Sequence, residues 1–284
     1  MIVFSKTQLD ESKYIKIAED YYTDADDWNK KRYDEKHLEL CICVAQRRFN
    51  LMFTAQSSCA IRRIVRLDPY EMRPHCISTT TKKVDIVRWH YGEIDSGAEF
   101  IDSLLVANPV RTIFDLAKCD TPQSLLASIN DCLYKGLLTK NEISDFLESK
   151  INIRGKNKVK KVLGVATNKC ESALESLAWI KINNSGFMLP EQQVNVKIQG
   201  LLIGRVDMIW EVRNRKIILE LDGMNKYNTL PDLRKEKVRE DHLRRLGYEV
   251  IRATWKDAMN GNLITYLEDA KIPRRRYYKN SIIC

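Results

Sequence analysis

The stretch 205-RVDMIWEVRNRKIILELDG-223 decides the fold of the C-terminal half of the chain. It contains two runs rich in Val, Ile, Leu and Trp, separated by the polar triplet Arg-Asn-Arg. Residues of this kind favour strands, and a short polar break between two such runs predicts a β-hairpin. Acidic residues, among them Asp207, interrupt the apolar runs. Because side chains alternate along a strand, Glu220 and Asp222 are expected on the same face as each other.

The segments on either side extend this hairpin into a larger unit. Apolar residues at helical spacing predict a helix over 168–184, and a β-rich run predicts a further strand over 191–198. A helix is expected from Pro231 to Gly247, followed by a strand over 248–255 and a last helix over 256–270. The order αβββαβα predicts an α/β (α+β) fold with a mixed sheet flanked by helices.

The N-terminal half is a second α+β module. It is expected to hold extended segments at 76–80 and 84–91 and helices over 27–49, 55–64, 109–120, 121–136 and 139–150. Thr121 is expected to cap one helix, Gly136 to end it, and Thr139 with Glu142 to start the next.

A basic run, 150-KINIRGKNKVKKVLG-164, separates the two halves. It holds six basic residues and no acidic one, which is typical of a solvated linker, while a strap that contacts phosphates is the alternative. We therefore expect an N-terminal DNA-binding or regulatory domain, a C-terminal domain and a basic tail, over 1–160, 161–270 and 271–284.

The composition favours a polyanionic partner. The chain of 284 residues has a formal net charge of +9, which attracts nucleic acid through steering and counterion release. Its eight cysteines form no CxxC pair, so a zinc site is disfavoured. The start of the chain has no secretory leader and no long apolar run follows, so we expect a cytoplasmic protein with no membrane contact.

The carboxylates at Asp207, Glu220 and Asp222 carry the chemistry of the C-terminal half. Removing a charge from water is unfavourable unless it is paired or bound to a metal ion. Pairing with Arg205 or Arg252 is one interpretation. The other is a hard divalent cation, because Mg²⁺ and Mn²⁺ prefer oxygen ligands and can activate water for phosphate chemistry.

Asp207, twelve intervening residues and then Glu220-Leu221-Asp222 resemble the signature of the PD-(D/E)XK nucleases. The longer string ES…RVD…ILELDG…KY…EKVREDHLRRLGYEVIRATW, over about 171–258, is similar to the Vsr-like (very-short-patch-repair-type) endonuclease domains. The resemblance implies a restriction-endonuclease-like fold that hydrolyses DNA with Mg²⁺ or Mn²⁺. It implies metal ligands at Asp207, Glu220 and either Asp222 or the Leu221 carbonyl, with Glu175 holding a metal-bound water or a second ion.

Asp222 stands where the resembled signature has its lysine. The missing cation could come from Lys226, which would orient the attacking water and offset charge on the phosphorus, or from Lys237 on the following helix. Lys226 is the preferred candidate because Gly223 permits a tight approach after the strand. A solvated lysine is the alternative.

The helix over 232–246 mixes basic and acidic residues, which is typical of a solvated face with ion pairs or of a surface that contacts DNA. Glu240 and Asp241 are candidates to support the acidic site, and His242 is either a packing residue or a weak site candidate. The tail 273-PRRRYYKN-280 is either disordered or a clamp on nucleic acid. The candidate DNA-binding residues are Arg234, Arg239, Arg244, Arg274, Arg275 and Arg276.

The N-terminal half is similar, over about 50–150, to antitoxins of the abortive-infection type IV systems (AbiEi-like). The residues that carry this likeness are 53-FTAQSSCAIRRI-64 and 107-ANPVRTIFDLAK-118. The resemblance implies a regulator that binds DNA. Arg62, Arg63 and Arg111 are candidates for phosphate contact, and Arg111 is equally a candidate structural residue at a helix start.

Three functions are therefore compared. The leading one is a Mg²⁺-dependent DNA endonuclease in phage defence or restriction. The second is a DNA-binding, antitoxin-like regulator that keeps a nuclease fold without turnover. The third is an interaction protein of a defence complex, active only with a partner chain. DNA is the expected partner, with a homodimer or a defence-system protein as further partners.

Overall fold

The computed structural model describes residues 2–3, 13–18, 21–48, 51–79, 86–92, 97–149, 154–198, 201–223 and 230–275. Lys226 and Arg276 lie outside these ranges, and Arg234 belongs to a helix whose first side chains are not described. The chain divides into two compact units, Met1–Leu163 and Gly164–Cys284, and each is considered by itself. No helix among the described residues is long and apolar enough to span a bilayer.

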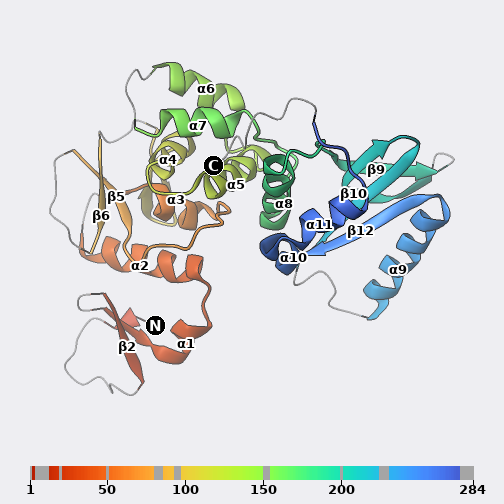
Figure 1. Cartoon of the computed structure of the whole chain (residues 1–284). Helices are drawn as coiled ribbons and strands as arrows, with labels where there is room; N and C mark the ends of the chain where they lie inside the picture. The colour runs from red at the N-terminus through yellow and green to blue at the C-terminus, as the bar shows by residue number, and fades with distance from the viewer. Residues whose placement is uncertain are drawn as a thin grey trace. The chain divides into compact units, whose positions relative to one another are not determined.

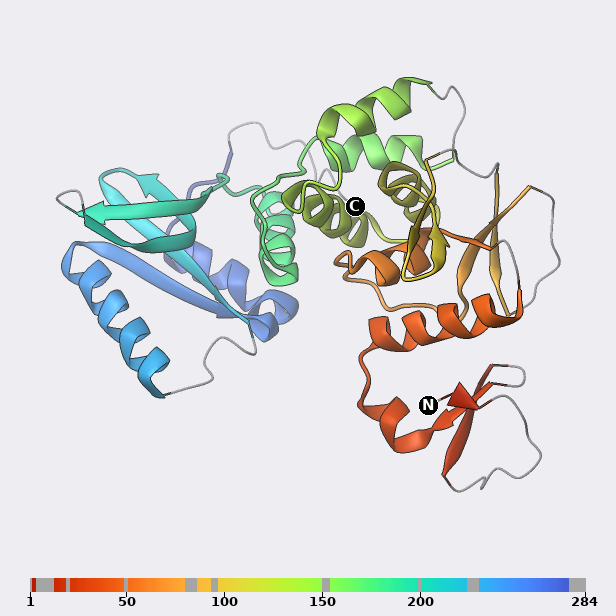
Figure 2. The same ribbon diagram turned by 180° about the vertical axis from the view of Figure 1, so that it is seen from behind.

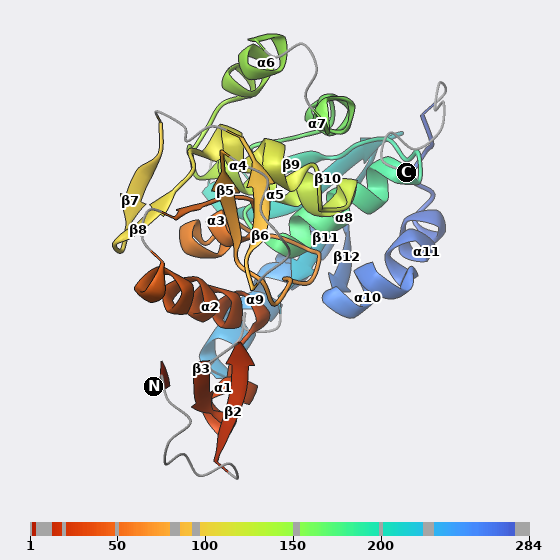
Figure 3. The same ribbon diagram turned by 90° about the vertical axis from the view of Figure 1, so that its left-hand side faces the viewer.

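The first unit contains a five-stranded mixed sheet of order β6-β5-β4-β8-β7. Its edge hairpin, β7–β8, joins the rest of the sheet through the parallel pairing of β8 with β4, and Figure 3 shows this hairpin at the left. A second, antiparallel sheet of order β1-β3-β2 lies at the start of the chain. The strands are β1 (Ile2–Val3), β2 (Tyr14–Ala18), β3 (Tyr21–Asp24), β4 (Met52–Phe53), β5 (His75–Ser78), β6 (Arg88–Tyr91), β7 (Glu99–Ile101) and β8 (Leu104–Val106).

Seven helices accompany these sheets in the described part of the first unit. They are α1 (Ala25–Lys30), α2 (Tyr33–Arg47), α3 (Ala55–Arg62), α4 (Pro109–Leu116), α5 (Pro122–Tyr134), α6 (Lys140–Ser149) and α7 (Lys156–Leu163). The single helix predicted over 27–49 is wrong, because the backbone of Arg32 is extended between α1 and α2. The Arg32 amide donates to Glu35 Oε2 at 2.8 Å, so a new helix starts there.

The predicted helix caps are confirmed. Thr121 Oγ1 accepts from the Ser124 amide at 3.2 Å, and Gly136 follows α5 with a φ of +65° that a side chain would disfavour. The Glu142 amide donates to Thr139 Oγ1 at 3.2 Å while the Thr139 amide donates to Glu142 Oε2 at 2.6 Å. These two bonds form a capping box at the start of α6.

The core of the first unit joins α2 and α3 to the five-stranded sheet. One cluster of buried side chains contains Cys41, Val44, Phe53, Ile61, Cys76, Val87, Leu104 and Val106. The cysteines serve there as small apolar residues, and burial raises the pKa of Cys41 to about 12. A thiol of that kind stays protonated near neutral pH and is a poor metal ligand.

The basic run between the two halves is not a linker over 156–163. It forms α7, whose Val159 and Val162 are buried, while Lys158 Nζ donates to the Asp120 carbonyl at 2.8 Å. The two valines lie three residues apart on one helix face. Their burial stabilises a packed helix here in spite of the many basic residues of the segment. Arg154, Lys160 and Lys161 remain exposed.

The second unit is built on a four-stranded mixed sheet of order β12-β11-β10-β9. Strands β9 to β11 are antiparallel neighbours and β12 runs parallel to β11. Helix α9 lies along one side of this sheet, and α8, α10 and α11 lie together on the other (Figures 1 and 2). The elements are α8 (Ala173–Asn184), β9 (Glu191–Ile198), β10 (Leu201–Val212), β11 (Arg215–Asp222), α9 (Leu230–Arg245), β12 (Tyr248–Thr254), α10 (Trp255–Asn260) and α11 (Asn262–Asp269).

This arrangement confirms an α/β class with a mixed sheet flanked by helices. The predicted last helix is two helices, because Gly261 adopts a φ of +93° between α10 and α11. Leu243 of α9 packs against Ile218, Val206 and Val250, which holds that helix to the sheet. The hairpin β10–β11 is therefore fixed in register from Val212↔Arg215 to Met208↔Leu219, just short of the carboxylates.

Candidate functional site

Asp207 lies at the end of the hairpin remote from the turn. Its Oδ2 accepts a hydrogen bond from the Leu221 amide at 2.8 Å. The carboxylate therefore contacts the backbone of β11 between Glu220 and Asp222. This bond fixes the position of the Asp207 carboxylate because a backbone donor has no rotamer freedom. Strand pairing thus determines where this acid lies.

Glu175 is held beside Asp207 by the first turn of α8. Its Oε1 accepts from Ser172 Oγ at 2.8 Å, and its Oε2 accepts from the Glu171 amide and from Gln193 Nε2, each at 2.9 Å. The residue is only 8% exposed. Burial raises the pKa of Glu175, and the negative charge of Asp207 acts in the same direction. Gln193 lies across from Asp207 in the pairing of β9 with β10, so its hydrogen bond to Glu175 places this acid at the same end of the hairpin as Asp207.

Glu220 and Asp222 are each paired with an arginine. Arg239 Nη2 of α9 lies 2.9 Å from Glu220 Oε1, and Glu220 is 4% exposed. The Arg239 side chain passes close to Gly204 on its way to this carboxylate. A Cβ atom at position 204 would lie only 3.0 Å from Arg239 Cδ. Arg252 Nη1 lies 3.0 Å from Asp222 Oδ2. The ion-pair interpretation is thus confirmed for Arg252, while Arg239 takes a role other than the predicted DNA contact.

Arg252 of β12 also connects Asp222 to helix α9. Arg252 Nε donates to Glu240 Oε2 at 2.8 Å, and Arg244 Nε donates to Glu240 Oε1 at 2.9 Å. Burial alone would raise the pKa of Glu240, but the two arginine hydrogen bonds outweigh it and the pKa is lowered. Glu240 is therefore connected to Asp222 through Arg252. Arg205, the other predicted partner, pairs with Glu171 at 2.6 Å.

These pairings bear on the expected metal ion. Among the residues that the structure describes, no three Asp, Glu, His or Cys side chains are arranged to hold one. Glu175 is buried and Asp207 is partly exposed, and Mg²⁺ commonly binds one or two carboxylates while keeping several waters. The donor set of Glu175 and Asp207 fits such an ion better than the arginine-paired Glu220 and Asp222.

Gln193 of β9 belongs to the same cluster and was not predicted. Its Nε2 donates to Glu175, while its Oε1 is buried with no hydrogen-bond partner among the described residues. Its φ is +54°, which is unusual for a residue inside a strand. A glutamine in the run EQQVNVKI has no local signature of such a role, so sequence alone could not identify it.

The other predicted residues of the second unit lie apart from this cluster. Lys237, Asp241 and His242 are exposed on α9. Arg274 binds the Ser185 carbonyl, lies 2.7 Å from Glu268 and stacks 4.5 Å from the centre of the Phe187 ring. Arg275 donates to the Asn183 carbonyl at 2.7 Å, and Arg244 also donates to the Val250 carbonyl at 3.1 Å.

The described start of the tail is thus ordered against the end of α8, which corrects the expectation of disorder for Arg274 and Arg275. The carbonyl groups at a helix C-terminus lack partners within the helix and carry partial negative charge. Arginine side chains satisfy both needs, so these two residues have a structural role in the second unit.

The arginines predicted to contact phosphate in the first unit have internal partners. Arg111 Nε lies 2.8 Å from Asp115 Oδ2, and its amide donates to the Asn108 side chain that caps α4. Arg62 pairs with Glu99 at 2.6 Å. Arg63 is exposed and ends α3 with a φ of +55°. The structural alternative for Arg111 is therefore the one that its contacts support.

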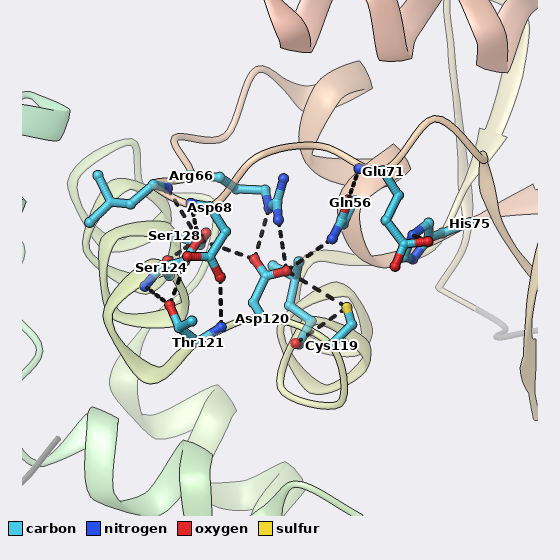
Figure 4. A network of polar contacts seen from close by, with 12 residues as sticks. Gln56, Arg66, Asp68, Glu71, His75, Cys119, Asp120, Thr121, Ser124 and Ser128 are labelled. Carbon is cyan, nitrogen blue, oxygen red and sulfur yellow. Dashed lines mark hydrogen bonds and ion pairs between the residues drawn. The ribbon is translucent and has the colours of Figure 1, made fainter. Parts of the chain in front are cut away.

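The first unit also contains a network of polar contacts that was not predicted from the sequence (Figure 4). Arg66 and Asp120 form a two-bond ion pair at 2.8 and 2.7 Å with both side chains fully buried. Gln56 Nε2 donates to Asp120, and Asp68 accepts from the Thr121 amide and hydroxyl. These bonds tie the segment after α3 to the start of α5, so we assign the network to folding.

Comparison with known proteins gives only distant relatives. The chain is 23% identical over 151 residues to the uncharacterized proteins MT2308 and Rv2248 of two strains of Mycobacterium tuberculosis, over 53% of its own length. It spans about half, 55%, of the length of these curated relatives. No protein-family model and no solved structure matches the chain. Neither relative has a name that states an activity.

Proposed function

We propose that the second unit is a metal-dependent DNA endonuclease whose site is centred on Glu175 and Asp207. The observation that carries the proposal is their position: Gln193, which donates to Glu175, lies across from Asp207 in the sheet, so the two carboxylates share one neighbour. Like charges in a partly buried site are unfavourable without a proton or a cation between them. A divalent cation supplies that charge and leaves both acids ionised.

The surrounding residues support this assignment. Ser172 and Gln193 fix the orientation of Glu175, and the Leu221 amide fixes Asp207. A Mg²⁺ or Mn²⁺ ion bound by these acids would activate a water molecule and stabilise charge on a phosphoryl group. Glu220 and Asp222 take a supporting role in the proposal, because Arg239 and Arg252 already offset their charge. Lys226 keeps its proposed role beside the attacking water.

The fold and the charge of the chain agree with the proposal. The strand order β12-β11-β10-β9, with one parallel neighbour, and the element order αβββαβ up to β12 suit a restriction-endonuclease-like topology. A net charge of +9 suits a phosphodiester polymer as substrate. DNA, in restriction or phage defence, is the proposed substrate and setting.

The test is cleavage of supercoiled plasmid with Mg²⁺ or Mn²⁺. We expect the wild-type protein to nick or linearise the plasmid, and Glu175→Gln and Asp207→Asn to lower the rate at least a hundredfold. Glu211→Gln is the matched control, since Glu211 lies on the same strand as Asp207 and pairs only with exposed Lys216 in the described contacts. Equal cleavage by all four proteins would remove Glu175 and Asp207 from the site.

A second candidate is a DNA-binding regulator that keeps this fold without turnover. The pairing of Asp222 with Arg252 favours it, because an ion-paired aspartate stands where the resembled signature has its lysine. Tight, salt-sensitive binding of duplex DNA with no cleavage at any divalent cation concentration would support the regulator over the nuclease.

A further inference from the structure

Gln193 has a strained backbone in the middle of a strand. Gln192 pairs with Met208 and Val194 with Val206, so Gln193 lies across from Asp207. Its φ of +54° is left-handed, a conformation that side chains other than those of Asn and Asp rarely adopt. The other described non-glycine residues of this unit with positive φ lie in the β10–β11 turn or directly after α11, namely Arg213, Asn214 and Lys271. Strain inside a strand persists only where the surrounding structure maintains it.

In this conformation the Gln193 amide contacts Glu175 from the strand position across from Asp207. An ionised carboxylate only accepts hydrogen bonds, so the NH₂ group must face Glu175, which it contacts at 2.9 Å. The amide oxygen then faces away from Glu175, and it is buried without a partner among the described residues. A buried acceptor that lacks a donor destabilises the fold, and in native structures it commonly marks a bound water, an ion or a functional role.

We propose that Gln193 is a positioning residue of the Glu175–Asp207 site, with its NH₂ group orienting Glu175 and its oxygen accepting a hydrogen from a water bound beside the two acids. This inference rests on the proposed function, because that water is the one a divalent cation brings. The left-handed backbone is what the site requires, since it lets one strand residue reach the carboxylate of α8. The water supplies the donor that Oε1 lacks.

Substitution by glycine tests the side chain without adding backbone strain. Glycine adopts positive φ at no steric cost, so Gln193→Gly keeps the strand path and removes only the amide. Arg213→Gly is the matched control, because Arg213 has a φ of +47° in the hairpin turn, at the opposite end of β10–β11 from the acids. Gln193→Asn is a second variant, since asparagine tolerates this conformation but has an amide one methylene shorter.

The readout is the Mn²⁺ concentration needed for the same fixed rise in Tm of the full chain. A metal that binds only the folded state stabilises it by RT ln(1 + c/Kd), where c is the metal concentration, so the concentration needed scales with Kd. We expect Gln193→Gly and Gln193→Asn to need at least ten times more Mn²⁺ than the wild type, and Arg213→Gly to match it. If either Gln193 variant does not fold, the other decides the result.

Two failures are distinguishable. A wild-type protein and Gln193 variants that respond to the same Mn²⁺ concentration overturn the role of Gln193 and leave the metal site in place. A wild-type protein whose Tm does not respond to Mn²⁺ or Mg²⁺ overturns the proposed function, and the inference about Gln193 falls with it.

Discussion

The Asp207 carboxylate accepts a hydrogen bond from the Leu221 backbone amide at 2.8 Å. This bond joins the two strands just beyond the regular pairing of β10 with β11, which ends at Met208↔Leu219. The hairpin therefore directs one acid towards Glu175 of α8, while the neighbouring Glu220 and Asp222 are engaged by arginines.

The raised pKa of Glu175 predicts a specific pH dependence. A carboxyl group whose pKa is higher in the folded state favours folding while it is protonated, so its contribution is present below its unfolded-state pKa and lost as pH rises through its folded-state pKa. In the absence of divalent cations, Glu175→Gln should therefore remove a loss of stability that the wild type shows above about pH 4.5. Urea unfolding from pH 4 to 7 measures the difference between the two proteins. A constant difference over this range would contradict the raised pKa.

Arg239 should stabilise the second unit through Glu220. Removing one partner of a buried ion pair leaves a charge poorly compensated, so Arg239→Gln should lower the free energy of unfolding by about 3 kcal/mol. Adding Glu220→Gln should recover part of this loss, because the uncompensated charge is then absent. Arg205→Gln is the control, since its pair with Glu171 is more exposed and should cost less than about 1 kcal/mol. Equal effects of the two arginine variants would show that burial of Glu220 is unimportant.

The ion pair of Arg66 with Asp120 should be among the strongest polar contributions to the first unit. Both side chains are fully buried, so Asp120→Asn should destabilise the unit by about 3 kcal/mol. Thermal unfolding followed by Trp fluorescence and circular dichroism measures the change. Asp131→Asn is a comparison on the same helix bundle, since Lys135, the partner of Asp131, is partly exposed. A smaller effect at Asp120 than at Asp131 would count against this assignment.

The exposed lysines of α7 test the phosphate-contacting alternative for the basic run. Lys160→Gln with Lys161→Gln should leave stability unchanged and weaken binding of duplex DNA. If both lysines contact phosphates, the slope of log affinity against log salt concentration should become shallower by about two. Lys30→Gln with Lys140→Gln removes the same charge from exposed positions of the same unit. Identical slopes for the two double variants would show that Lys160 and Lys161 are solvated and do not contact phosphates.

The local features of the fold could be predicted because their causes are local. Runs rich in strand-favouring apolar residues predicted β10 and β11, and the Thr121 and Thr139 caps were evident from residue type and spacing. The break between α1 and α2 was missed because both segments are helical in pattern, and the interruption depends on the Glu35 side chain reaching Arg32. Helix α7 was missed because its charges obscured two buried valines.

The candidate site could be predicted only in part, since its contacts join distant segments. The burial of Glu220 was evident from its apolar neighbours, whereas Asp207, which has neighbours of the same kind, is partly exposed. Which arginine pairs with each carboxylate depends on tertiary packing. The pairing of Glu220 with Arg239 was therefore not evident from the sequence, which suggested Arg205 or Arg252 as partners. The strained conformation of Gln193 has no sequence signature, because glutamine is not among the residues that favour positive φ.

The most direct test of the account is an anomalous-difference map from a crystal of the full chain soaked in Mn²⁺. We predict a peak within coordination distance of carboxylate oxygens of both Glu175 and Asp207, with Arg239 and Arg252 still paired to Glu220 and Asp222. A peak at Glu220 or Asp222 with both arginines displaced, or no peak near Asp207, would contradict the proposed site.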